Sequence, residues 1–210
     1  MPALIDARIS LDTIDDQLTW TLARVASVPE TTGLVDEVQS FLDELDLQRL
    51  TARDVARGVL RAEAAVAHAD HGLDQATRAF ARALGYHLPE GMDSPRARAY
   101  FPKNPSAVTQ LALGRQVDEL REWPGRILAE PDPALHPHAA TLRAALAAGE
   151  AALAARRAAE TARTQYRLDV HLPFIDRLNA ARRSWALRLD EIALALGQPP
   201  SWARGFFRGA

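Results

Sequence analysis

Cysteine is absent from this sequence of 210 residues, and lysine occurs only once, at Lys103. The absence of cysteine excludes a disulfide framework, a thiolate nucleophile and a zinc site with cysteine ligands. Strand signals are also scarce, because the chain has no alternating run of β-branched residues and no Asn-Gly or Asp-Gly turn. The class that remains is a helical protein without covalent cross-links.

Long apolar runs are missing as well. A membrane span needs about 18 consecutive apolar residues, and the most apolar tract, residues 144–155, is interrupted by Gly149 and Glu150. The N-terminus becomes acidic within its first six residues and lacks the basic start and apolar stretch of a secretory signal. We therefore expect a cytoplasmic protein without a membrane partner.

The charges are distributed unevenly, although the net charge is only −2. Residues 1–50 carry ten acidic residues and three arginines, a net charge of −7, whereas residues 151–210 carry ten arginines and five acidic residues, a net charge of +5. The two segments could pair within one chain or between two chains, or they could form separate solvated faces. Exposed ion pairs contribute little to stability, so separate solvated faces are the favoured interpretation.

Helical periodicity runs through the whole chain and is clearest between residues 52 and 85. Apolar residues or alanines recur there in alternating steps of four and three, at Val55, Val59, Ala62, Val66, Ala69, Leu73, Ala76, Phe80 and Ala83. A small residue every seven positions lets a partner helix approach closely, which predicts packing against a near-antiparallel neighbour. Gly85 is the expected end of this helix. Leu50–Thr51 and Pro173 are the expected breaks in the long helical stretches.

Three short segments recur in the same order in the two halves of the chain. The pairs are RVASVPE (24–30) with RILAEPD (126–132), ARALG (81–85) with ALALG (193–197), and ARAYF (97–101) with ARGFF (203–207). We therefore predict an internal duplication, with one helical repeat over residues 1–104 and a second over residues 105–210, packed together as one domain. Amphipathic helices joined by short turns bury their apolar faces on one another, so the expected fold is an all-α antiparallel bundle of about four to six helices.

No arrangement of catalytic residues is recognisable. The chain has neither a Gly-x-Ser-x-Gly motif nor a glycine-rich phosphate loop. His68 and His71 fall on the outer face of their helix and lack the Glu-x-x-His pattern of di-metal bundles. Polar residues enter the apolar seam only near Pro173. We assign no catalytic residue, metal ligand or cofactor, and we expect a non-catalytic structural or interaction module.

Each half ends in a tail that combines aromatic residues with arginine. The candidate partner-binding residues are Arg98, Tyr100, Phe101, Trp202, Arg204, Phe206 and Phe207. Trp, Tyr and Arg dominate the energetics of protein interfaces, so we expect contact with a second copy or another protein, and a homo-oligomer as the assembly. The alternative is that these rings cover the open ends of the bundle, where burying one ring contributes about 2–3 kcal/mol.

Two further functions stay open. The first is nucleic-acid binding by the arginine-rich face of residues 156–188, with Arg156, Arg157, Arg163, Arg167, Arg182 and Arg183 as candidates. A sequence pI of about 6.3 favours a solvated charged face instead. The second is a small-ligand or metal-binding bundle, in which a gap is expected near Trp20, Tyr86, Trp123 and Trp185.

Overall fold

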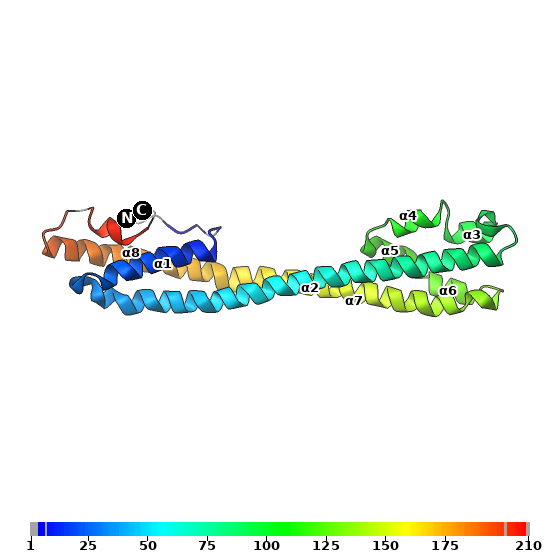
Figure 1. Ribbon diagram of the computed structural model, residues 1–210, viewed down its shortest axis with the longest axis horizontal. Helices are drawn as coiled ribbons and strands as arrows, with labels where there is room; N and C mark the ends of the chain where they lie inside the picture. Colours follow the sequence, from blue (N-terminus) through cyan, green and yellow to red (C-terminus); the bar gives the residue numbers. More distant parts are fainter. Residues whose placement is uncertain (1–3, 7, 200, 209–210) are drawn as a thin grey trace. The chain divides into compact units, whose positions relative to one another are not determined.

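The computed structural model describes residues 4–6, 8–199 and 201–208. All regular secondary structure within these residues is helical (Figure 1), which confirms the all-α prediction. The long helices α2 (Val35–His87) and α7 (Pro137–Tyr166) account for much of it.

The chain forms two compact units, and both α2 and α7 contribute residues to each. Unit 1 contains residues 1–56 and 162–210, and unit 2 contains residues 57–161. The units therefore differ from the predicted repeats, 1–104 and 105–210. The duplication concerns the origin of the sequence, which these contacts do not test, and it stays a prediction.

Unit 1 combines segments from both ends of the chain. Its elements are α1 (Leu11–Ala26), the 3₁₀ turn η1 (Pro29–Leu34), the first part of α2, the last turn of α7, the π-helical turn η4 (Arg167–His171), α8 (Leu172–Ala195) and the 3₁₀ turn η5 (Ala203–Phe206). Ser10 caps α1, because its hydroxyl accepts a hydrogen bond from the Thr13 amide at 3.1 Å. Gly197 ends α8 with a φ of 65°, and the Gln198 amide donates to the Ala193 carbonyl at 2.8 Å in a Schellman motif.

The core of unit 1 is assembled from α1, α2, α8 and the C-terminal residues. Fully buried members are Ile14, Leu18, Val38, Leu45, Phe174, Leu178, Leu189 and Phe206. Phe41 of α2 lies edge-on to Trp185 of α8, with ring centroids 5.6 Å apart. Each helix thus buries its apolar stripe on the others, as its periodicity predicts.

Ion pairs connect the acidic beginning of the chain to its basic end inside unit 1. Glu44 pairs with Arg177, Glu37 pairs with Arg188, and Trp185 Nε1 donates to Glu37 Oε2 at 3.0 Å. The interpretation of the two charged segments as separate solvated faces was therefore wrong. The apolar packing of α2 on α8 brings these side chains together, although each exposed ion pair contributes little to stability.

Unit 2 surrounds the second part of α2 and the first part of α7 with short helices. These are η2 (Gly91–Asp93), α3 (Pro95–Tyr100), α4 (Pro105–Thr109), α5 (Leu113–Leu120), α6 (Trp123–Leu128) and η3 (Pro133–Leu135). Several of these helices begin with a capping side chain followed by proline in the first turn. Ser94 caps α3 and Asn104 caps α4.

Six of the nine residues of the predicted seam of α2 are buried, and Val55, Val66 and Ala83 are half-buried. Ala62, Ala69, Leu73, Ala76 and Phe80 all lie in the core. The close approach between helices depends on Gly149 of α7, where an added Cβ would lie 3.0 Å from Val117 Cγ2 and 3.3 Å from Leu113 Cδ1. Gly149 therefore sets the spacing between α5 and α7, whereas the close approach expected at the alanines of α2 stays a prediction.

The helix boundaries differ from the predictions at two of three places. α2 continues through Leu50 and Thr51, because the Thr51 hydroxyl donates back to the Leu47 carbonyl at 3.1 Å instead of capping a new helix. α2 also passes Gly85 and ends at His87. The break near Pro173 is confirmed: the Leu172 amide donates to the Arg167 carbonyl in the π-helical turn η4 that precedes the proline.

Candidate functional site

The aromatic tail of the first half lies inside unit 2. Tyr100 and Phe101 are buried, and their rings contact Phe80 and Trp123 edge-on, with centroids 5.0 Å apart for Phe80–Tyr100 and for Phe101–Trp123. A partner could reach these rings only by opening the unit. The contacts favour the alternative role, in which the rings close the end of the unit, and Arg98 is the exposed member of this set.

A polar network fixes Tyr100 within this aromatic cluster. Its hydroxyl donates to Glu130 Oε1 at 2.9 Å, Arg96 pairs with the other carboxylate oxygen, and Arg126 lies over the Tyr100 ring at 4.4 Å. Burial is the main reason that the pKa of Tyr100 rises to about 12. Burial alone would also raise the pKa of Glu130, but the hydrogen bonds from Arg96 and Tyr100 outweigh it and lower that pKa. Both groups are therefore committed to a structural pair.

The C-terminal tail packs onto unit 1. Phe206 and Phe207 are buried, and Trp202 stands edge-on to Phe206 with centroids 4.7 Å apart. Trp20 Nε1 donates to the Gly205 carbonyl at 3.2 Å, which ties the tail to α1. Arg204 is exposed, so it alone combines charge with free access among the four C-terminal candidates, Trp202, Arg204, Phe206 and Phe207.

The predicted arginine face includes one buried residue. Arg182 is only 2% exposed: its Nη1 donates to Gln17 Oε1 at 3.2 Å, and its guanidinium lies over the Phe207 ring at 5.3 Å. Burial lowers the pKa of Arg182 to about 10. Arg182 therefore cannot contact phosphate in this conformation, and its assignment to an exposed face was wrong.

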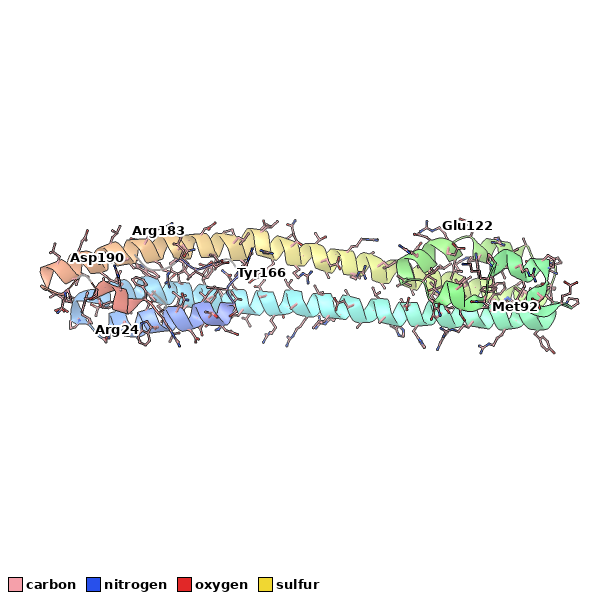
Figure 2. All side chains as sticks on the ribbon, turned by 90° about the horizontal axis from the view of Figure 1, so that it is seen from above. Arg24, Met92, Glu122, Tyr166, Arg183 and Asp190 are labelled. Atoms are coloured by element: carbon pink, nitrogen blue, oxygen red, sulfur yellow. The ribbon has the colours of Figure 1, made fainter. Side chains whose placement is uncertain are left out.

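The other arginines of that set are accessible to different degrees. Arg156 belongs to unit 2 and pairs with Glu160 at 3.6 Å, one turn along α7. Arg157, Arg163, Arg167 and Arg183 are exposed, and Figure 2 shows Arg183 on the outside of α8. A basic surface in unit 1 is thus limited to the end of α7, the turn η4 and the outer face of α8.

The residues named for metal or ligand binding do not form a site. His68 and His71 are exposed on the outer face of α2, and His71 bonds to Gln75 at 2.7 Å. The four residues expected around a gap are divided between the units, with Trp20 and Trp185 in unit 1 and Tyr86 and Trp123 in unit 2. Trp123 and Trp185 are buried, whereas Tyr86 is 86% exposed.

A cleft of about 760 Å³ lies in unit 1, where the end of α7 and the turn η4 meet the beginning of α1. Figure 2 shows Tyr166 beside that end of α1. The lining residues are Arg8, Ile9, Ser10, Leu11, Ala52, Arg163, Thr164, Tyr166, Arg167, Leu168, His171 and Leu172. We call this feature the arginine cleft.

Positive charge in the arginine cleft is not compensated by its lining. Arg163 and Arg167 are one helical turn apart, and Arg8 reaches the same cleft from the segment before α1. None of the described lining residues is acidic. Across the described part of the chain these three guanidinium groups have no ion pair, whereas Arg177 and Arg188 of the same unit do.

Tyr166 forms a fixed wall of the arginine cleft. Its hydroxyl donates to the Gln48 carbonyl of α2 at 3.3 Å, and its ring stacks on His171 with an interplanar angle of 28°. Burial raises the pKa of Tyr166. The phenol is therefore a neutral donor that anchors the cleft wall to α2.

A second cleft, of about 610 Å³, lies in unit 2 between α2, α5 and α7. Glu63, Asp70 and Asp118 line it together with Arg115 and Arg156. Burial, followed by the nearby charge of Asp74, raises the pKa of Asp70. Because both signs of charge are present, this cleft does not select a ligand of one charge.

Asn179 and Gln116 are polar residues of the core that the hydrophobic pattern did not indicate. Asn179 of α8 accepts a hydrogen bond from the Ile5 amide at 2.8 Å and donates to the Ile5 carbonyl at 3.0 Å. Gln116 of α5 is buried and donates to Asp74 of α2 at 3.0 Å. The expectation that polar residues enter the seam only near Pro173 was wrong, because each of these side chains has a partner far away in the sequence.

Wider comparisons add no established activity. No helix in the described part of the chain combines the length and the hydropathy that a membrane span requires. Nor do the described histidine, aspartate and glutamate side chains gather in a group of three or more that could hold a metal ion. No protein-family model matches the chain, and neither a curated protein nor a solved structure matches it.

Proposed function

We propose that this protein is a helical interaction module that binds an anionic partner through the arginine cleft of unit 1. The observation that carries the proposal is the uncompensated charge of Arg8, Arg163 and Arg167, which line one cleft without an acidic neighbour in its described lining. Guanidinium groups left without a partner in a cleft are suited to carboxylates or phosphates, because their planar donors match both groups.

The chemistry of the arginine cleft supports binding more than catalysis. An arginine side chain stays protonated at physiological pH, so it orients and neutralises an anion but does not transfer a proton. The carboxylates whose pKa values are lowered, Glu37 and Glu130, are held in pairs with Arg188 and Arg96. These two carboxylates therefore have a structural role in the fold.

The partner of this module carries negative charge, and an acidic surface on a second copy of the chain is the first candidate. Unit 1 carries 15 acidic residues against 12 arginines, counted over residues 1–56 and 162–210, so its surface supplies negative as well as positive charge. Self-association through opposite charges would weaken with salt. The expected homo-oligomer would then form through the arginine cleft, while the buried aromatic rings close each unit.

Light scattering at low and high ionic strength tests this assignment. The variant Arg163→Glu/Arg167→Glu should bring the mass of the protein down to that of one chain at low salt. The matched control Arg183→Glu/Arg204→Glu changes the same charge in the same unit outside the cleft and should leave the mass unchanged. If the wild type already has the mass of one chain, self-association is wrong and binding of polyglutamate, followed by fluorescence anisotropy, tests a different acidic partner.

Nucleic-acid binding is the second candidate, supported by the exposed Arg163, Arg167 and Arg183 of unit 1. Such binding should weaken steeply with salt, because each phosphate contact releases a counterion. A single-stranded oligonucleotide and polyglutamate of equal charge separate the two functions. Tighter binding of the oligonucleotide, lost in the Arg163→Glu/Arg167→Glu variant, would support the nucleic-acid assignment.

We also infer that the two repeats predicted from the sequence are related bundles. The support is local: Tyr100 with Phe101 closes unit 2, and Phe206 with Phe207 closes unit 1. In each case the aromatic pair follows a helix end and a proline-containing turn. The duplication can be tested with homologous sequences, if some of them have two halves that resemble each other more clearly than the halves of this chain do.

A further inference from the structure

The arginine cleft has an apolar side that an acidic protein surface would not use. Ile9, Leu11, Leu168 and Leu172 line it alongside the arginines. Leu168 is 54% exposed, although it is a large apolar residue. A purely acidic ligand would satisfy the guanidinium groups and leave this apolar side in water, whereas a purely apolar ligand would bury the arginines without a partner.

The π-helical turn η4 supplies part of this combination. In an α-helix the amide of Leu172 would bond four residues back, but here it donates to Arg167, five residues back. Arg167, Leu168 and His171 of this turn all line the cleft, and Pro173, which has no amide hydrogen, lies in the first turn of α8 that follows. The Tyr166 ring, stacked on His171, closes one side.

The size and charge of the cleft limit the ligand further. A volume of about 760 Å³ lies within the range of roughly 300–1,000 Å³ that small-molecule sites occupy. Three arginines around one cleft match the charge of a phosphate monoester, which is about −1.5 to −2 at neutral pH, better than the single charge of a carboxylate.

We propose that the arginine cleft binds a small amphiphile that carries a phosphate monoester on an alkyl chain. Arg8, Arg163 and Arg167 hold the phosphate, and Ile9, Leu11 and Leu168 contact the chain. This inference rests on the proposed function, because it names the ligand class of the same cleft.

Isothermal titration of the full-length protein with decyl phosphate, decanoate, decanol and inorganic phosphate tests the ligand class. Decyl phosphate should bind roughly a hundredfold more tightly than inorganic phosphate or decanol, since it alone gains from both sides of the cleft. It should bind about tenfold more tightly than decanoate. Equal binding of inorganic phosphate, decanol or decanoate would overturn the inference. Saturation by decyl phosphate only near its solubility limit would show adventitious binding and would overturn the inference as well.

Variants separate this inference from the proposed function. Arg163→Gln/Arg167→Gln should weaken decyl phosphate binding about thirtyfold, whereas the control Arg183→Gln/Arg204→Gln should not change it. Leu168→Asn should weaken decyl phosphate binding but leave polyglutamate binding unchanged. Polyglutamate binding without decyl phosphate binding would overturn the amphiphile and keep the proposed function, and absence of both would overturn both. Circular dichroism of each variant verifies that the fold is retained.

Discussion

Buried polar residues on α8 decide how unit 1 holds the ends of the chain. Asn179 binds both the amide and the carbonyl of Ile5, at a position that is 9% exposed. Asn179→Ala would leave two buried backbone groups without a partner, so we expect the free energy of unfolding to fall by about 2 kcal/mol. Urea denaturation measures it. Gln39→Ala, at an exposed amide of the same unit, is the control, and an equal loss in both variants would contradict the assigned role.

Arg182 and its neighbour Arg183 are predicted to differ sharply. Arg182→Ala removes a buried side chain that contacts Gln17 and Phe207, and it should destabilise the protein by about 3 kcal/mol. Arg183→Ala changes an exposed side chain and should stay within about 0.5 kcal/mol of the wild type. Thermal denaturation of the two variants tests this difference. If Arg182→Ala weakens partner binding and Arg183→Ala does not, the loss therefore reflects damage to the fold.

Glu130 makes the stability of unit 2 depend on acid pH. Its pKa in the folded protein lies below the ordinary value of 4.5, so the unfolded chain takes up a proton first as the pH falls. The contribution of Glu130 is complete above pH 4.5 and is lost as the pH falls through the lowered pKa. Glu130→Gln should therefore lose stability at pH 7 and show a smaller further loss between pH 5 and about pH 3 than the wild type. Parallel acid titrations followed by circular dichroism would refute this if the two curves had the same shape.

Helix positions were predictable from the sequence where a repeating pattern determines them. The seam of α2 and the break before Pro173 depend on local spacing or backbone chemistry, and both are found. Asn179 and Arg182 could not be found in this way. A hydrophobic pattern assigns every polar residue to the outer face, and their partners Ile5 and Gln17 lie more than 160 residues away.

The candidate site was predictable only in part, for the same reason. Arg163 and Arg167 belonged to the arginine set that the composition of the chain's end suggested. Arg8 and the apolar residues Ile9 and Leu11 approach them only because unit 1 joins the two ends of the chain. The π-helical turn that carries Arg167 and Leu168 depends on hydrogen bonding over five residues, which Pro173 permits but does not specify.

Glycines of unit 2 test whether small residues set the helix spacing. Gly149→Ala would place a Cβ 3.0 Å from Val117 Cγ2 in a packed core, and we expect a loss of about 1 kcal/mol despite the better helix propensity of alanine. At Gly72 of α2 an added Cβ meets no atom within 4 Å, so Gly72→Ala should gain about 0.5–1 kcal/mol. Urea denaturation compares the two variants. Stabilisation by both would show that α5 and α7 do not need this glycine.

At the scale of the whole molecule, the aromatic pairs provide an independent probe for each unit. Phe206→Ala removes a fully buried ring from the core of unit 1, and Phe101→Ala removes a buried ring from the core of unit 2. Each substitution should cost about 3–5 kcal/mol within its own unit. The expected mass of the protein does not change, because these rings face their own cores.

Hydrogen exchange locates the loss. Phe206→Ala should accelerate amide exchange in residues 11–56 and 167–195, whereas Phe101→Ala should accelerate it in residues 57–161. This separation follows from the division of the cores between the two units, since opening one core exposes its own amides first. Faster exchange over the whole chain in either variant would mean that the units unfold together. A drop in mass by light scattering would instead show that the aromatic tails hold copies of the chain together.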